Sequence, residues 1–317
     1  MIAFGCAIED TLAFESYAAR GFERAAEPDS EVHLIGAMRN RARNLNLLAD
    51  LAAQREDLEA LVIVHPHLEI TDGDLCQRVR DLLQSEPEVG LIGVTGSIRP
   101  LSPAWWTGRV VSADVTLRYQ EHGGGELPRW LPFRPAPAPA DVDVVEGSLL
   151  VLSPWAVRNL RFDESLPAGH GCDVDISLQA RSAGRRVRVI ETSVTFHGAL
   201  ELVDENDYAW LRAHELLADK WEGAFGSSGP LAPPNWFARP DDDTDDDARW
   251  RERAWRAEAE REAARSAAHT RQLHGRAALR PLETELMDIE GSLSWRLTAP
   301  LRRVNQWRRR RRSRARA

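Results

Sequence analysis

Short apolar runs that alternate with helix-type patterns constrain the fold of this chain more than any other feature. The runs are short enough to form buried strands, and they cover residues 2–7, 31–35, 61–64 and 89–94. Segments with helical spacing or a helix-capping start separate them, at residues 9–21, 39–53 and 71–84. This alternation predicts a doubly wound α/β sheet with right-handed crossovers, flanked by helices. Ligands bind such sheets beyond the carboxyl ends of the strands, so polar residues there are the first functional candidates.

The segment 96–141 interrupts this alternation. It contains paired tryptophans, three consecutive glycines and an alternation of Pro with Ala, so we expect a long, irregular excursion. The alternation then resumes as a strand, two helices, a strand and an amphipathic helix at 142–153, 154–160, 172–183, 187–196 and 204–221. We therefore expect one α/β domain over residues 1–225.

Composition and cysteine usage are those of a soluble intracellular protein. The apolar fraction of 43%, the charged fraction of 28% and the net charge of −8 are ordinary for a globular chain. Its three cysteines form neither a metal-binding spacing nor a disulfide framework, which favours a reducing cytosol. No basic-then-apolar leader is present, and no apolar run approaches the roughly 20 residues of a membrane span. We therefore expect a cytoplasmic protein.

A pair of carboxylates marks the stretch at residues 162–184. Asp173 and Asp175 follow a loop rich in Gly and Pro and fall in the first turn of a predicted helix, with Gly184 as its stop. The helix dipole favours negative charge in that turn. The two acids are therefore either a catalytic pair or simple caps of the helix.

The stretch resembles the Phe-Asp-Glu … Phe-His-x-Tyr-Asp-x-Asp-Leu … Arg-x-x-Gly pattern of family 2-like glycosyltransferases with a GT-A fold, in the StrF-related branch. The matching residues are Phe162, Asp163, Glu164, His170, Asp173, Asp175, Leu178, Arg181 and Gly184. Cys172 departs from the usual Tyr or Glu. The resemblance covers about residues 1–225 and implies a GT-A-like mixed sheet. It implies that Asp173 is the catalytic base and that Asp175 orients the loop or the acceptor.

A histidine pair follows the third predicted strand, in His65-Pro-His67-Leu-Glu69. The family usually has Leu-His-x-Asp-Val there, and its Asp helps to hold a divalent metal on the donor diphosphate. Here His67 replaces the Asp, and imidazole suits Mn²⁺ better than Mg²⁺. Glu69 shares a strand face with His67 and can supply the missing carboxylate. A neutral histidine pair at a strand end is the alternative.

A late histidine completes the expected metal site. His197 follows the last predicted strand, where the family has a His that completes the metal or diphosphate site; a plain surface His is the alternative. The resemblance thus implies a divalent cation, Mn²⁺ or Mg²⁺, held by His67, His197 and Glu69.

Further residues match nucleotide- or sugar-binding positions. Val145-Glu146-Gly147 resembles the family's Val-Asp-Gly, which faces the donor sugar and the acceptor, with Glu146 one methylene longer. Gly147 permits close approach of the backbone to a ligand, although a strand bulge explains it as well. The other candidates are Glu9, Arg39, Asn46, His65 and His170. Among them Arg39 can reach a nucleotide phosphate, and Asn46 matches an Asn of the family.

Beyond residue 225 the composition changes. Residues 226–248 are Pro-rich and acidic, which is typical of a linker, and residues 249–291 have a helical period without a clean heptad run. The basic tail, residues 292–317, carries ten Arg and no acid. Its start looks like a segment appended to many bacterial surface-polysaccharide glycosyltransferases. The tail either binds an anionic membrane surface at the inner face of the cell membrane or is a solvated end, and any contact with nucleic acid is non-specific.

These patterns predict a glycosyltransferase of the hexosyltransferase type. The expected reaction moves a sugar from a nucleotide-diphosphate sugar to a hydroxyl of a glycan or lipid-linked acceptor, with inversion. A catalytically degenerate binding module is the first alternative, favoured by His67. A metal-dependent hydrolase using His65, His67 and His197 comes last, because no further carboxylate motif stands at hydrolase spacing.

Overall fold

The computed structural model describes residues 1–36, 40–119, 136–198, 207–226 and 231. Arg39 and the predicted helix and tail at 249–291 and 292–317 lie outside the described residues. No helix within the described ranges is long and apolar enough to cross a membrane. The domain boundaries expected from the sequence stay predictions.

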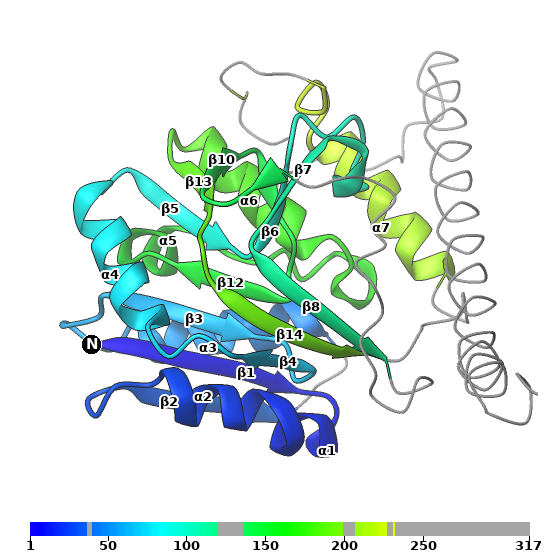
Figure 1. Cartoon of the computed structure of the whole chain (residues 1–317). Helices are drawn as coiled ribbons and strands as arrows, with labels where there is room; N and C mark the ends of the chain where they lie inside the picture. The colour runs from blue at the N-terminus through cyan, green and yellow to red at the C-terminus, as the bar shows by residue number, and fades with distance from the viewer. Residues whose placement is uncertain (37–39, 120–135, 199–206, 227–230, 232–317) are drawn as a thin grey trace, which may run out of the picture. The chain divides into compact units, whose positions relative to one another are not determined.

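A seven-stranded mixed sheet forms the centre of the fold (Figure 1). In spatial order its strands are β10 (Ala140–Val142), β13 (Arg186–Val189), β5 (Val89–Gly93), β12 (Leu149–Leu152), β3 (Ala60–Val64), β1 (Ile2–Ile8) and β2 (Glu31–Gly36). The pairs β1–β2, β1–β3 and β13–β5 are parallel, whereas β12 runs antiparallel to both of its neighbours. The prediction of a mixed α/β sheet flanked by helices is confirmed.

Helices cover both faces of this sheet, and this explains why its strands read as continuous apolar runs. The helices are α1 (Thr11–Ala13), α2 (Ala19–Ala25), α3 (Arg41–Ala52), α4 (Leu75–Ser85), α5 (Pro154–Asn159), α6 (Cys172–Ser182) and α7 (Asp207–Lys220). Successive strand residues point to opposite faces: Leu61 and Ile63 pack with α3, α5 and α6, whereas Val62 and Val64 pack with α2 and α4. The core is therefore split into two layers by the sheet.

Local sequence signals set the helix ends that matter for the site. Asn40 caps α3 by accepting a hydrogen bond from the Arg43 backbone N–H at 3.2 Å. Gly171 precedes α6 with a φ of 70°, and Gly184 follows it with a φ of 74°. Both glycines hold left-handed conformations that other residues rarely adopt, so the predicted stop at Gly184 is confirmed.

Residues 96–141 differ from the expected irregular excursion. Their described part contributes strands to two small sheets, β11-β6-β7-β9 and β4-β14-β8. The segment supplies most of β6 (Thr95–Ile98), β7 (Arg109–Ser112), β8 (Asp114–Tyr119) and β9 (Ala136–Pro137). Their partners from other parts of the chain are β4 (Leu68–Ile70), β11 (Val144–Val145) and β14 (Ser193–Gly198). For the described part the expectation was wrong, because such short strands, interrupted by Gly and Pro, carry little periodicity of their own. The rest of the expected excursion, residues 120–135, lies outside the described residues.

The predicted strand at 142–153 is also broken. β11 pairs with β6 in one sheet, and β12 pairs with β3 and β5 in another. The chain changes sheets at residues 146–148, so Gly147 lies in a turn and not inside a strand. This break positions Glu146 and Gly147 beside the carboxyl end of β3.

Candidate active site

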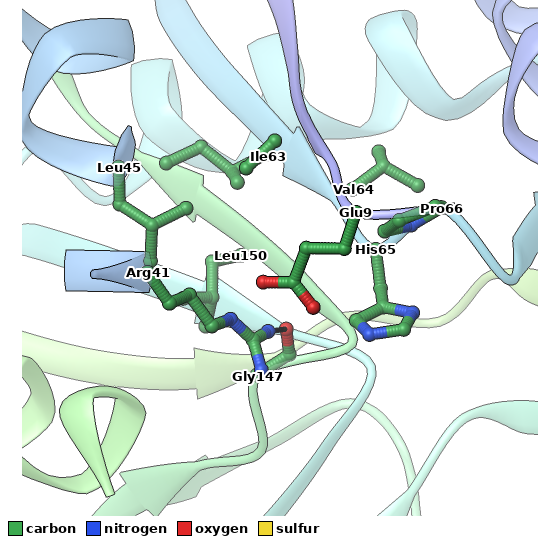
Figure 2. Close-up of a pocket in the computed structure, with 10 residues that line it drawn as sticks. Glu9, Arg41, Leu45, Ile63, Val64, His65, Pro66, Gly147 and Leu150 are labelled. Carbon is green, nitrogen blue, oxygen red and sulfur yellow. Dashed lines mark hydrogen bonds between the residues drawn. The ribbon is translucent and has the colours of Figure 1, made fainter. Parts of the chain in front are cut away.

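A pocket opens beyond the carboxyl ends of β1 and β3. Its lining residues are Ala7, Glu9, Arg41, Leu45, Ile63, Val64, His65, Pro66, Gly147 and Leu150 (Figure 2). Apolar side chains form much of the wall, and polar groups come from the strand ends and from the first turn of α3. The structure thus brings three of the predicted nucleotide- or sugar-binding residues, Glu9, His65 and Gly147, to one pocket.

Arg41 is the positive group of this pocket, and the sequence reasoning missed it. It is the first residue of α3, and its Nη2 donates to the Gly147 carbonyl at 3.2 Å. Figure 2 shows its guanidinium and the Glu9 carboxylate extending into the same space. Burial opposes its charge, but the nearby Cys172, Asp173, Glu9 and Glu146 together outweigh burial and raise the pKa of Arg41. The sequence signal for Arg41 is the helix-capping residue Asn40. A cap shortly after β2 places the next residue at the start of a helix, at the edge of the sheet where ligands bind.

Asp173 lies in the first turn of α6 and faces the turn at Gly147. A Cβ added to Gly147 would lie 3.1 Å from Asp173 Oδ2, so the absence of a side chain there makes room for the carboxylate. Asp173 Oδ1 accepts a hydrogen bond from the Val174 N–H at 2.9 Å. Burial raises the pKa of Asp173 above the ordinary range, while Arg41 opposes that rise. The carboxylate is therefore a stronger base than an exposed aspartate.

Glu146 adds a second carboxyl group next to Asp173. Its Oε2 accepts a hydrogen bond from Ser148 Oγ at 2.5 Å. Burial raises the pKa of Glu146, the Ser148 hydrogen bond opposes this, and the negative charge of Asp173 raises it further. The two carboxyl groups therefore disfavour each other's ionisation beside a single guanidinium.

Asp175 has a different environment, although it follows Asp173 by only two residues. Its side chain is 0% exposed. Oδ1 pairs with Lys220 Nζ at 2.8 Å and accepts from Trp221 Nε1 at 2.7 Å, and Oδ2 accepts from Gln179 Nε2 at 2.7 Å. Residues two apart on a helix point about 200° apart. Asp175 therefore faces α7, and these contacts favour a role in holding α6 over one in contact with substrate.

The histidines after β3 are held by the backbone. Burial lowers the pKa of His65 to about 3, so its ring is neutral, and its Nδ1 accepts from the His67 N–H at 3.2 Å. His67 Nδ1 lies 2.7 Å from the His197 carbonyl oxygen. A carbonyl can only accept, so Nδ1 is the donor and a neutral His67 ring keeps its lone pair on Nε2. That Nε2 lies 3.7 Å from Asp10 Oδ2.

Glu69 and His197 meet across the antiparallel pair β4–β14. His197 Nε2 lies 3.2 Å from Glu69 Oε2, and Arg24 Nη1 donates to Glu69 Oε1 at 3.1 Å. Tyr17, in the π-helical turn η1 (Phe14–Ala18), stacks on His197 with ring centroids 3.9 Å apart. We call His67, Glu69, His197 and Tyr17 the histidine cluster.

The predicted metal ligands His67, His197 and Glu69 do not fit a metal centre as they stand. They are neighbours, but His197 Nε2 and Glu69 are paired with each other and the Arg24 guanidinium competes for the Glu69 carboxylate, whereas His67 uses Nδ1 for the His197 carbonyl and keeps the Nε2 lone pair. In the described part of the chain, no group of three or more His, Cys, Asp or Glu residues is arranged to hold a metal ion.

Two further predicted residues lie away from the pocket lining. Asn46 bridges α3 to the segment before α6: its Nδ2 donates to the Phe162 carbonyl at 2.9 Å and to Glu164 Oε1 at 3.0 Å, and its Oδ1 accepts from the Phe162 N–H at 2.9 Å. These contacts favour a structural role for Asn46. His170 lies in the loop just before α6, close to Asp173 in the chain.

Comparison with known proteins gives one relative in sequence and distant likenesses among solved structures, of which two are described below. No protein-family model matches the chain. The chain is 26% identical over 198 residues to the streptomycin biosynthesis protein StrF of Streptomyces griseus, over 62% of this chain and 66% of StrF. It therefore spans slightly less than two thirds of that relative. The match agrees with the resemblance that the pattern at residues 162–184 indicates.

The structural likenesses are to A197 from STIV and to GalNAc-T7 in complex with UDP, GalNAc and Mn²⁺. A197 matches with 9% identity and a TM-score of 0.38, over 61% of this chain and 82% of A197. GalNAc-T7 matches with 9% identity and a TM-score of 0.43, over 71% of this chain and 48% of GalNAc-T7. Both likenesses are distant, and neither bears on the function of this chain.

Proposed function

We propose that this chain is a glycosyltransferase that moves a sugar from a nucleotide-diphosphate sugar to a hydroxyl of a glycan or lipid-linked acceptor, with inversion. The observation that carries the proposal is the Asp173 carboxylate at the start of α6, beside Gly147 and Arg41, within a pattern that resembles family 2-like glycosyltransferases. The similarity to StrF supports the same class. A hexosyl group is the sugar class that we expect.

In this proposal the donor nucleotide binds at the pocket beyond β1 and β3. Arg41 supplies a permanent positive charge for a phosphate group, and Glu9 can accept hydrogen bonds from ribose hydroxyls or a base N–H. The neutral His65 ring and the apolar wall can pack against the nucleoside. Each of these groups comes from a different element, so a bound nucleotide would contact β1, β3 and α3 together.

Asp173 is the base in this proposal. It takes the proton from the acceptor hydroxyl as that oxygen bonds to the anomeric carbon, and the bond from that carbon to the diphosphate breaks with its electron pair leaving on the phosphate oxygen. A single displacement of this kind inverts the anomeric centre. The raised pKa of Asp173 suits the role, since a stronger base removes a hydroxyl proton more readily.

A divalent cation stays an expectation from the family resemblance. His67, Glu69 and His197 are engaged with one another and with Arg24, so we derive no step through a metal. Likewise, peripheral binding to an anionic membrane surface is proposed from the composition of the basic tail alone.

Calorimetric titration with UDP-, GDP- and dTDP-sugars, with and without Mn²⁺, tests the proposal together with an assay of donor consumption. We expect binding of at least one nucleotide sugar and its turnover in the presence of an acceptor. Absence of binding across the panel would contradict the function.

A binding module without turnover is the second candidate. It is favoured by His67 at the position of the family's Asp and by the paired state of the expected metal ligands. Tight binding of a nucleotide sugar that stays intact with every acceptor tried would select this candidate.

A further inference from the structure

Lys220 is the only lysine in the chain, and it is buried between two carboxylates. It is the last residue of α7, with 7% of its side chain exposed. Its Nζ lies 2.7 Å from Asp163 Oδ2 and 2.8 Å from Asp175 Oδ1. The next residue, Trp221, donates from Nε1 to the same Asp175 oxygen at 2.7 Å. The end of α7 therefore makes two charge-assisted contacts with one buried carboxylate.

These contacts hold α6 on the side of the helix that faces away from the pocket. Asp175 faces α7, whereas Asp173, in the same turn, faces Gly147. The Asp175 N–H also bonds to the Gly171 carbonyl at 2.9 Å, so the residue that α7 holds belongs to the first hydrogen-bonded turn of α6. Any tilt of that turn would move the Asp173 carboxylate relative to the pocket.

The same lysine fixes the other end of the loop before α6. Asp163 opens that loop, and its Oδ1 accepts from both the N–H and the Oγ of Ser165, at 2.9 and 2.6 Å. At the far end, a Cβ on Gly171 would overlap Leu217 Cδ1, so α7 packs directly against the residue that begins α6. α7 therefore contacts both ends of the loop 163–171.

We propose that Lys220 and Trp221 are positioning residues that hold the first turn of α6 so that the Asp173 carboxylate faces Gly147; the chemical part of this rests on the proposed function. A compact ammonium fits between two carboxylates, whereas a planar guanidinium needs more room and a different geometry. This accounts for a lysine at this position in a chain that otherwise uses arginine. Removing the cation leaves buried carboxylates unpaired, which is costly in free energy.

Hydrogen exchange of the α6 amides tests the proposal without any substrate. The variants are Lys220→Met, Lys220→Arg and Trp221→Phe, and Arg212→Met is the matched control, because Arg212 lies on α7 but pairs with Glu215 on the same helix. We expect the Val174 and Asp175 amides to exchange at least about tenfold faster in the Lys220 and Trp221 variants, a local opening of α6. The control should exchange as the wild type does.

The second measurement is turnover, which a contact that only stabilises the fold would leave unchanged. In folded variants we expect donor affinity within about twofold of wild type and a fall in kcat of up to about 10²-fold, the order that a misplacement of about 1 Å costs. If Lys220→Met does not fold, Trp221→Phe and Lys220→Arg decide the question, since they keep the ring packing or the charge.

Unchanged exchange at Val174 and Asp175 in folded variants overturns the proposal, whatever the activity. Faster exchange spread evenly over the central sheet also overturns it, because that reports general destabilisation. If the wild-type protein consumes no donor, the proposed function fails, but the exchange data still decide whether α7 positions α6.

Discussion

The pocket that contains Arg41 and the separate histidine cluster both lie beyond strand ends. They differ in how far their polar groups are paired with other protein groups. In the pocket, Glu9, Arg41 and His65 face open space, and a glycine keeps the wall clear. In the histidine cluster, Glu69 is paired with Arg24 and His197. A chemically suitable residue type is therefore insufficient, because the side chain must also keep polar atoms that its protein neighbours do not use.

Among the variants, Asp173→Asn should lower turnover the most. An amide cannot take the acceptor proton, so turnover should fall by about 10² to 10⁴-fold, the usual cost of losing a general base. Nucleotide affinity should stay within a few fold, which titration of the variant measures. A folded variant with near wild-type turnover would remove Asp173 from the mechanism.

The pH dependence of kcat/KM should reflect the buried state of Asp173. The base must be ionised, and burial raises its pKa, so activity should be lost as pH falls through a value above the ordinary aspartate range near about 3.9. An acid limb at the ordinary value would mean that this carboxylate is well solvated in solution. Profiles measured with a saturating and a limiting donor separate effects on binding from effects on turnover.

His67→Asp should have a smaller effect, and it tests whether the histidine cluster binds a metal ion. The substitution restores a carboxylate where the family has one, and Mg²⁺ prefers oxygen ligands. We expect a modest gain in Mg²⁺-supported donor binding, while the wild type should prefer Mn²⁺. Indifference to the substitution and to chelators alike would exclude the histidine cluster from metal binding and would favour the binding module.

Deleting the basic tail, residues 292–317, should have the smallest effect on the catalytic domain. Each basic residue near an anionic surface contributes about 1 kcal/mol, weakened by salt. Full-length protein should sediment with anionic vesicles at low salt, and the truncated form should stay in the supernatant with the same Tm. Equal vesicle binding by both forms would remove the membrane role, and a collapse in Tm would mean that the tail packs on the core.

The sequence predicted the central sheet well, because strands buried on both faces are apolar throughout and stand out from helical patterns. It did not predict β4, β6, β7 and β8, because their own signal is weak. It also merged β13 and β14 into one strand at 187–196, although they belong to different sheets. In the site, the limit is distance along the chain. The role of Asp175 depends on Lys220 and Trp221, the latter 46 residues away, and no local pattern near Asp175 indicates that pairing.

Arg41 illustrates what a local signal can and cannot give. Asn40 as a helix cap predicts that the next residue starts a helix at the ligand edge of the sheet. That Arg41 reaches the Gly147 carbonyl depends on β12 running antiparallel beside β3, which the sequence pattern does not specify. The sequence predicted close backbone approach at Gly147, but its turn became visible only with the change of sheet at residues 146–148.

Titration of nucleoside diphosphates against Arg41→Met and Arg43→Met tests most directly whether the pocket is the donor site. Arg43 is the matched control, since it lies on α3 two residues later and is exposed. We expect the wild type to bind at least one of UDP, GDP and dTDP. Arg41→Met should weaken this binding at least about tenfold, because a charged hydrogen-bonding partner is lost. Arg43→Met should leave the binding unchanged. Equal weakening by both variants, or unimpaired binding by Arg41→Met, would contradict it.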